Sequence, residues 1–161
     1  ATVTLNIVPV AASTGTAYGK GCYSTDGTCA TITSSLLEPY WPLVVRAECA
    51  NEDLNQNGIL DPTEDFNGND RLDPGNVVTV SAKTLTTDAS GFAFFNVVYA
   101  QEYANWVRAE LSARATVAGS EATELARFIL PILADDVTDK DVSPPGNPSP
   151  FGTANNCAVP D

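Results

Sequence analysis

The sequence contains no histidine and no methionine. Histidine is the commonest general base and the commonest transition-metal ligand in proteins, so its absence removes both roles at once. The chain also shows no nucleophile–base pair and no phosphate-binding loop. Pairs of carboxylates could in principle hydrolyse glycosides, but metal ligation, described below, accounts for the abundant acids. We therefore expect a protein that is not an enzyme.

Long apolar runs are also missing, which excludes a transmembrane helix and predicts no membrane insertion. The first residues do not form a charged and then apolar leader, so we expect that any signal peptide has been removed. The 161 residues fit one domain and are enough to bury a proper core.

Basic residues are scarce, with 8 Lys and Arg against 20 Asp and Glu, for a net charge of −12. This balance repels nucleic-acid phosphates and anionic membranes, so we expect no nucleic-acid partner. Many of the acids lie in one run whose only base is Arg71. Such a run is usually a solvated acidic face, but its regular spacing favours metal ligation. Its acidic members are Glu48, Glu52, Asp53, Asp61, Glu64, Asp65, Asp70 and Asp73.

The four cysteines lack the close CxxC spacing of zinc sites. An even number of widely spaced cysteines in an acidic chain predicts two disulfides, and hence a secreted, periplasmic or cell-surface location. Three pairings are open. We favour Cys22–Cys29, because the Asp26-Gly27 turn between them brings hairpin arms together, and this leaves Cys49–Cys157. Four reduced, buried cysteines are the alternative.

Residues 53–64 match the calcium-binding loop of EF-hand type at each informative position. Ca²⁺ takes about six to eight oxygens, which such a loop supplies from its positions 1, 3, 5, 7, 9 and 12. Gly58 stands where this loop turns sharply and needs a positive φ. We expect one calcium ion here, and a loop without an ion is the alternative. The ligands are Asp53, Asn55, Asn57, the backbone carbonyl of Ile59, Asp61 and Glu64.

Residues 65–76 repeat the pattern at once. Asp70 replaces the glycine, which it can do because aspartate tolerates the left-handed region. Asn76 replaces the bidentate glutamate, so this loop has two carboxylates at ligand positions where the first has three. It should therefore bind a second Ca²⁺ more weakly or borrow a ligand from its neighbour. Its ligands are Asp65, Asn67, Asn69, the backbone carbonyl of Arg71 and Asp73.

Alternating segments rich in β-branched residues predict strands rather than helices. Residues 106–117 have helix-forming composition, but their strict polar/apolar alternation favours a strand. The proline-rich residues 143–150 cannot join a central strand. We expect an all-β, immunoglobulin-like antiparallel β-sandwich over residues 1–142, with the calcium-binding insertion at 50–76 and a tail at 143–161 tethered by a disulfide. The predicted strands are 2–10, 41–49, 77–83, 91–99, 106–117 and 124–130.

Residues 87–94, with the sequence TDASGFAF, resemble a turn-and-strand signature of bacterial Ig-like domains of the invasin/intimin type. Residues 103–107 and 117–121 look like its continuation. The resemblance implies an Ig-like sandwich in a multidomain secreted or cell-surface protein, often a repeat in a stalk or adhesin, flanked by further domains. The calcium insertion and the disulfides depart from that pattern. The matching motif belongs to the fold, so it carries over no binding residues.

The leading functional prediction is a structural or adhesive module made rigid by Ca²⁺ and disulfides. The alternative is a module that binds a protein or polysaccharide ligand through surface aromatics, although aromatics in sandwich strands usually belong to the core. A calcium sensor or a dockerin-like module is disfavoured, because no amphipathic helices flank the loops. The candidate aromatics are Tyr40, Trp41, Tyr99, Tyr103 and Trp106.

Overall fold

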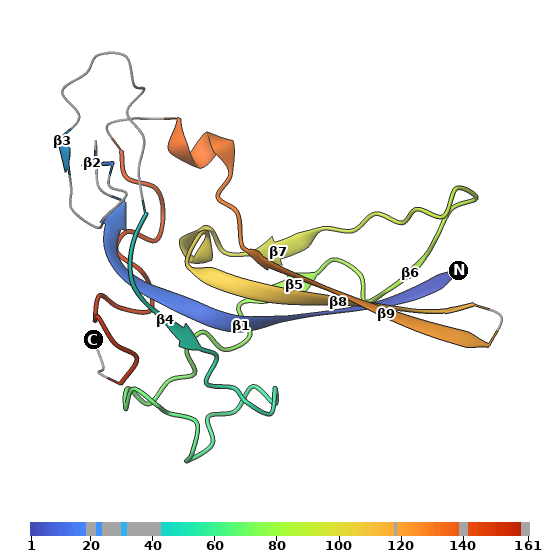
Figure 1. The fold of residues 1–161 in the computed structure, drawn as a ribbon, viewed down its shortest axis with the longest axis horizontal. Coiled ribbons are helices and arrows are strands. Elements are labelled where there is room, and N and C mark those ends of the chain that lie inside the picture. The colour runs from blue at the N-terminus through green and yellow to red at the C-terminus, as the bar shows by residue number, and fades with distance from the viewer. Residues whose placement is uncertain (19–21, 24–29, 32–42, 118, 139–141, 159–161) are drawn as a thin grey trace.

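The computed structural model describes residues 1–18, 22–23, 30–31, 43–117, 119–138 and 142–158 (Figure 1). Every strand pair among them is antiparallel, which confirms the predicted all-β class. The described helical segments are two short 3₁₀ turns, η1 (Gln101–Tyr103) and η2 (Ala134–Val137). Within the described part of the chain, no helix has the length and apolar character to cross a membrane.

The largest sheet has the strand order β4-β1-β8-β9, and β6 pairs with one end of β1. Its strands are β1 (Thr2–Tyr18), β4 (Leu43–Ala50), β6 (Thr84–Thr86), β8 (Val107–Val117) and β9 (Ser120–Ile129). Two smaller pairs are formed by β5 (Val78–Val80) with β7 (Val97–Tyr99), and by β2 (Cys22–Tyr23) with β3 (Ala30–Thr31).

The core lies between the large sheet and the β5–β7 pair, which Figure 1 shows beside β8. Leu5 and Ile7 of β1 pack with Val78 and Val80 of β5, and Val107, Ala109 and Leu130 complete the buried cluster. Two antiparallel layers that share one core are consistent with a β-sandwich. The immunoglobulin topology within that class stays a prediction.

The alternation of β8 is confirmed in three dimensions. Val107 and Ala109 are fully buried, whereas Arg108 and Glu110 are half-buried. Arg108 pairs with Glu48 of β4, across β1, and Glu110 pairs with Arg127 of the adjacent β9. The strand predicted at 2–10 lies within β1, and the strand predicted at 124–130 forms the end of β9, which stops at Ile129. Period two therefore outweighed helix propensity here, because the sheet buries one face of β8.

The strand predicted at 91–99 is wrong for residues 91–96, because β7 begins only at Val97. Phe92 and Phe94 are 64% and 87% exposed, so their β-propensity is not supported by packing. The predicted turn before them is present: Oδ1 of Asp88 accepts hydrogen bonds from the N–H groups of Ser90 and Phe92. Of the segment predicted at 77–83, only β5 forms a strand.

The C-terminal segment, residues 142–158, lies against the second half of β1. Gly15 N–H donates to Gly152 O at 2.9 Å, and the Ser149 hydroxyl donates to Ser13 O at 2.7 Å. A disulfide joins Cys49 of β4 to Cys157, which confirms that predicted pair. The predicted Cys22–Cys29 pair lies outside the described residues. The tail is therefore fixed at the strand that leads into the acidic insertion.

Candidate metal centre

The acidic insertion leaves the large sheet at the end of β4 and leads into β5 of the β5–β7 pair, and Figure 1 shows it projecting beyond the large sheet. Its first residues are fixed to β1. The Asn51 side chain donates to Pro9 O at 2.8 Å, and Asn51 N–H donates to Val10 O at 3.1 Å. Glu52 N–H donates to Asp73 O at 3.1 Å, so the start and the end of the insertion lie side by side.

The first loop, residues 53–64, wraps its backbone around its own side-chain oxygens. Asp53 accepts hydrogen bonds from Asn57 N–H at 2.9 Å and from Gly58 N–H at 3.0 Å. Oδ1 of Asn55 accepts from Asn57 N–H, and Oδ1 of Asn57 accepts from Ile59 N–H. Gln56 and Gly58 have φ values of 58° and 74°, so the chain reverses sharply at both.

The second loop, residues 65–76, repeats each of these contacts. Asp65 accepts from Asn69 N–H at 3.0 Å and from Asp70 N–H at 3.1 Å. Oδ1 of Asn67 accepts from Asn69 N–H, and Oδ1 of Asn69 accepts from Arg71 N–H. Gly68 and Asp70 have φ values of 73° and 59°. The prediction that Asp70 takes the left-handed conformation of the missing glycine is therefore confirmed.

The aspartate at position 9 closes each loop from the opposite side. In the first loop, the side-chain amides of Asn55 and Asn57 donate to Oδ2 of Asp61 at 2.8 and 3.2 Å. In the second loop, those of Asn67 and Asn69 donate to Oδ2 of Asp73 at 3.1 and 2.7 Å. Each loop thus brings together the side chains that the sequence predicts at positions 3, 5 and 9.

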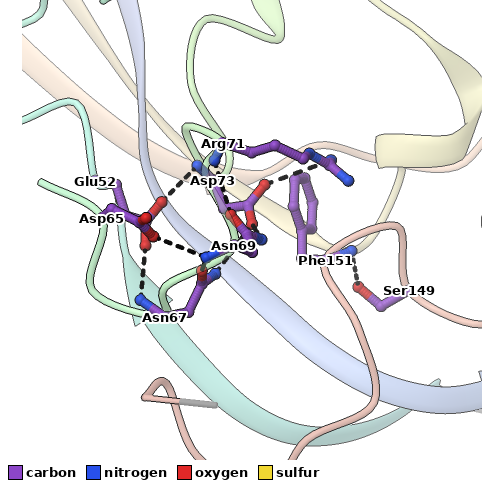
Figure 2. Close-up of polar contacts among 8 residues, drawn as sticks. All are labelled: Glu52, Asp65, Asn67, Asn69, Arg71, Asp73, Ser149 and Phe151. Atoms are coloured by element: carbon purple, nitrogen blue, oxygen red, sulfur yellow. Dashed lines mark hydrogen bonds and ion pairs between the residues drawn. The ribbon is translucent and has the colours of Figure 1, made fainter. Parts of the chain in front are cut away.

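A glutamate carboxylate binds the backbone of each loop in the same way. Glu64 accepts from Leu54 N–H at 3.0 Å and Asn55 N–H at 3.4 Å on one oxygen, and from Asp61 N–H at 3.1 Å on the other. These donors are positions 2, 3 and 9 of the first loop. In the second loop the same positions are Phe66, Asn67 and Asp73, and their N–H groups donate to Glu52 at 3.0, 3.3 and 2.9 Å. Figure 2 shows the bonds from Asn67 and Asp73.

The sequence prediction did not include Glu52 among the candidate ligands. The signal that could have found it is a repeat that begins at glutamate: residues 52–63 read EDLNQNGILDPT, and residues 64–75 read EDFNGNDRLDPG. An alignment that starts at the first aspartate assigns each glutamate to the end of the loop before it. In that alignment Glu52 belongs to neither loop, because no loop precedes it. It is nevertheless the equivalent of Glu64 in the repeat.

Four of the acids in the insertion are buried: Glu52, Asp53, Glu64 and Asp73 are 3%, 3%, 2% and 8% exposed. Burial raises the pKa of the Glu52 carboxyl, although its three N–H donors and the nearby Asp73 also act on it. Among the described bases only Arg71 pairs with one of the four, at 3.6 Å from Oδ1 of Asp73. Buried carboxylates are costly unless they are paired or coordinate a metal.

The donors in both loops are oxygens, which suits a hard cation such as Ca²⁺ rather than zinc or copper. Among the described residues, no three Asp, Glu, Cys or His side chains converge closely enough to hold a metal by themselves. A site in either loop therefore also needs asparagine oxygens and a backbone carbonyl. Each amide oxygen that accepts one N–H keeps a second lone pair for an ion. The predicted carbonyl donors belong to Ile59 and Arg71, whose N–H groups are held within their loops.

The candidate aromatic residues Tyr99, Tyr103 and Trp106 are each buried or half-buried in the structure. Trp106 is 1% exposed and donates from Nε1 to Gly146 O. Tyr103 stacks on Phe151 at 5.7 Å between ring centroids, and the Tyr99 hydroxyl donates to Pro131 O. The other two candidates, Tyr40 and Trp41, lie outside the described residues.

No family model, curated protein or solved structure matches this chain. The two loops themselves therefore carry the functional argument.

Proposed function

We propose that this chain is a calcium-stabilised, non-enzymatic module of a bacterial secreted or cell-surface protein, with a structural or adhesive role. The observation that supports it best is the repeated arrangement of the two loops. In each loop, the side chains at positions 1, 3 and 5 and one glutamate accept from equivalent backbone N–H groups. The aspartate at position 9 accepts from the side-chain amides of positions 3 and 5.

Electrostatics supports a bound cation. The four buried carboxylates have one arginine partner among the described bases, and they divide between the loops, Asp53 and Glu64 at the first and Glu52 and Asp73 at the second. A divalent cation in each loop would compensate their charge. The ion would add direct bonds from carboxylate, amide and carbonyl oxygens. In its absence, the hydrogen bonds within each loop have to hold these like charges together.

The position of the loops favours a structural calcium site over a calcium sensor. A sensor needs helices that move apart when the ion binds. Here the insertion connects β4 to β5, Asn51 binds the backbone of β1, and the disulfide at Cys49 lies just before the first loop. An ion in this segment would fix the connection between the two layers of the core.

The cellular setting rests on indirect support. The Cys49–Cys157 disulfide is typical of proteins in oxidising compartments. The resemblance of residues 87–94 to bacterial Ig-like domains suggests a multidomain surface protein. Its partner would then be a protein or polysaccharide ligand, with further domains on either side.

Thermal unfolding in EDTA and in excess CaCl₂ tests the proposal. A ligand that binds only the folded state stabilises it, so we expect the Tm to rise by about 5–10 °C in calcium. MgCl₂ is the matched control and should give a smaller rise, because Mg²⁺ keeps its water shell. An identical Tm in EDTA and in CaCl₂ would contradict the proposal.

A further inference from the structure

We propose that Glu52 supplies the carboxylate of the second calcium site in place of Asn76. Glu52, which precedes the first loop, then binds the ion of the second loop, and Glu64, which precedes the second loop, binds the ion of the first. This inference rests on the proposed function, because it requires that the loops bind calcium. It deepens that function by naming a ligand that the EF-hand register does not contain.

The first support is the equivalence of Glu52 and Glu64. Each carboxylate spans its loop from the N–H groups of positions 2 and 3 to the N–H of position 9. Glu64 is the position-12 residue that binds Ca²⁺ in a loop of this type. Glu52 presents both oxygens to the second loop in the same way, and Figure 2 shows it beside Asp65 and Asp73.

Asn76, the residue that the sequence register places at position 12, lies elsewhere. A Cβ atom added to Gly58 would lie 3.5 Å from Nδ2 of Asn76. The Asn76 side chain therefore lies against the first loop, and it also lines a hollow there with Gln56. Asn76 therefore occupies position 12 in the sequence of the second loop, but its side chain does not lie where a position-12 glutamate would bind the ion of that loop.

An independent observation comes from Asp73. This residue is 8% exposed, and its Oδ1 is buried without a hydrogen bond from any described residue. Its carboxylate faces the second loop, because Oδ2 accepts from the amides of Asn67 and Asn69. Arg71 forms an ion pair with Oδ1 at 3.6 Å, which is too long for a hydrogen bond. A buried oxygen of this kind needs an explanation, and a cation shared with Glu52 supplies one.

Glu52 and Asp73 are close enough to act together. Glu52 N–H donates to Asp73 O at 3.1 Å, Asp73 N–H donates to the Glu52 carboxylate at 2.9 Å, and both residues line a cavity of about 40 Å³. With Glu52 counted, the second loop has three carboxylates, Glu52, Asp65 and Asp73, as many as the first. The second site should then bind calcium about as tightly as the first.

The exchange of glutamates also couples the two sites. Glu52 is bonded in sequence to Asp53, the first ligand of the first loop, and Glu64 is bonded to Asp65, the first ligand of the second. An ion in either loop therefore orders a residue next to the other site. We expect positive cooperativity between the two ions, because the second ion meets a loop that is already ordered.

Calcium titration of the full chain, followed by ¹H–¹⁵N NMR, tests this inference. The amide of Gly58 reports on the first loop through its bond to Asp53, and the amide of Gly68 reports on the second through its bond to Asp65. In E52Q, the calcium midpoint at Gly68 should rise at least about tenfold, with a smaller change at Gly58. E64Q should give the mirror image. N76A is the matched control and should leave the Gly68 midpoint unchanged.

The outcomes separate the two proposals. If neither glycine amide responds to calcium in the wild-type chain, the proposed function fails. If Gly58 responds but E52Q leaves the Gly68 midpoint where it was, or if N76A shifts it as far as E52Q does, the Glu52 inference fails alone. Should E52Q lose the dispersed amide signals of β8, E52D takes its place. It keeps the charge but is one methylene shorter, so the same shift at Gly68 is expected and its absence contradicts the inference.

Discussion

The two loops make the same hydrogen bonds in different surroundings. Asn55 and Asn57 of the first loop are exposed, and Leu54 and Ile59 beside them are 63% and 64% exposed. In the second loop, the equivalent Asn67 and Asn69 are half-buried. The difference shows that the internal geometry of a loop follows its own sequence, whereas the burial of the loop depends on which other parts of the chain pack against it.

The cover of the second loop includes the C-terminal segment. Phe66 and Asp73 line a cavity together with Phe151 and Cys157, and Figure 2 shows Phe151 close to Arg71 and Asp73. Phe151 is held in turn by its stacking on Tyr103. The tail, the disulfide and the second loop therefore form one contact region, and the residues that line this cavity include none from 53–64.

Removing the Cys49–Cys157 disulfide should have the largest effect on stability and should affect the second loop more than the first. The crosslink closes a sequence separation of 108 residues, so C49S/C157S should lower the unfolding free energy by about 2–5 kcal/mol, as measured in urea. In the same variant, the calcium midpoint at Gly68 should rise more than that at Gly58. Equal shifts at the two glycines would show that the tail does not support the second loop.

Substitutions at position 6 of each loop should have opposite signs. Gly58 has a φ of 74°, so G58A should destabilise the protein by about 1–2 kcal/mol. Asp70 has a φ of 59°, and D70G should relieve its backbone strain and stabilise the protein by up to about 1 kcal/mol. Urea unfolding in EDTA measures both. Destabilisation by D70G would mean that the Asp70 side chain contributes more than its backbone costs.

The pH dependence of the calcium-free protein should show the smallest effect. Burial raises the pKa of Glu52 above its ordinary value, so folding favours the protonated carboxyl. That contribution to stability is complete below the unfolded pKa, about 4.3, and is lost as pH rises through the higher folded pKa. E52Q cannot lose a proton, so its unfolding free energy in EDTA should fall less over this range than that of the wild type. Parallel profiles would contradict this.

Much of the candidate site could be predicted from the sequence because its contacts are local. The bonds from Asp53 to Asn57 and Gly58 span 4 and 5 residues, and those of Asp65 span similar distances. Asp70 could be assigned a positive φ because its place in the repeat matches Gly58. The strand β8 could be predicted in the same way, from a strict alternation that a half-buried strand requires.

The incorrect and missing predictions concern contacts that local patterns do not encode. Residues 91–96 have strand-like composition, but composition cannot tell whether packing will support a strand there. Glu52 reaches Phe66 and Asp73 across 14 and 21 residues, and an EF-hand register that starts at Asp53 does not include it. The Asn76 side chain lies against the first loop, which no spacing within the second loop could reveal.

The sequence by itself determined the all-β class, the positions of the two loops and the side chains that organise each loop internally, because these depend on periodicity and on short-range hydrogen bonds. The tertiary structure decided that Glu52 binds the backbone of the second loop, that the C-terminal segment covers that loop, and that Asp73 is buried with one oxygen that accepts no hydrogen bond from any described residue. The physical reason is that these features require β4, the start of β5 and the tail to be brought together. Only the folded sheet and the Cys49–Cys157 disulfide do so.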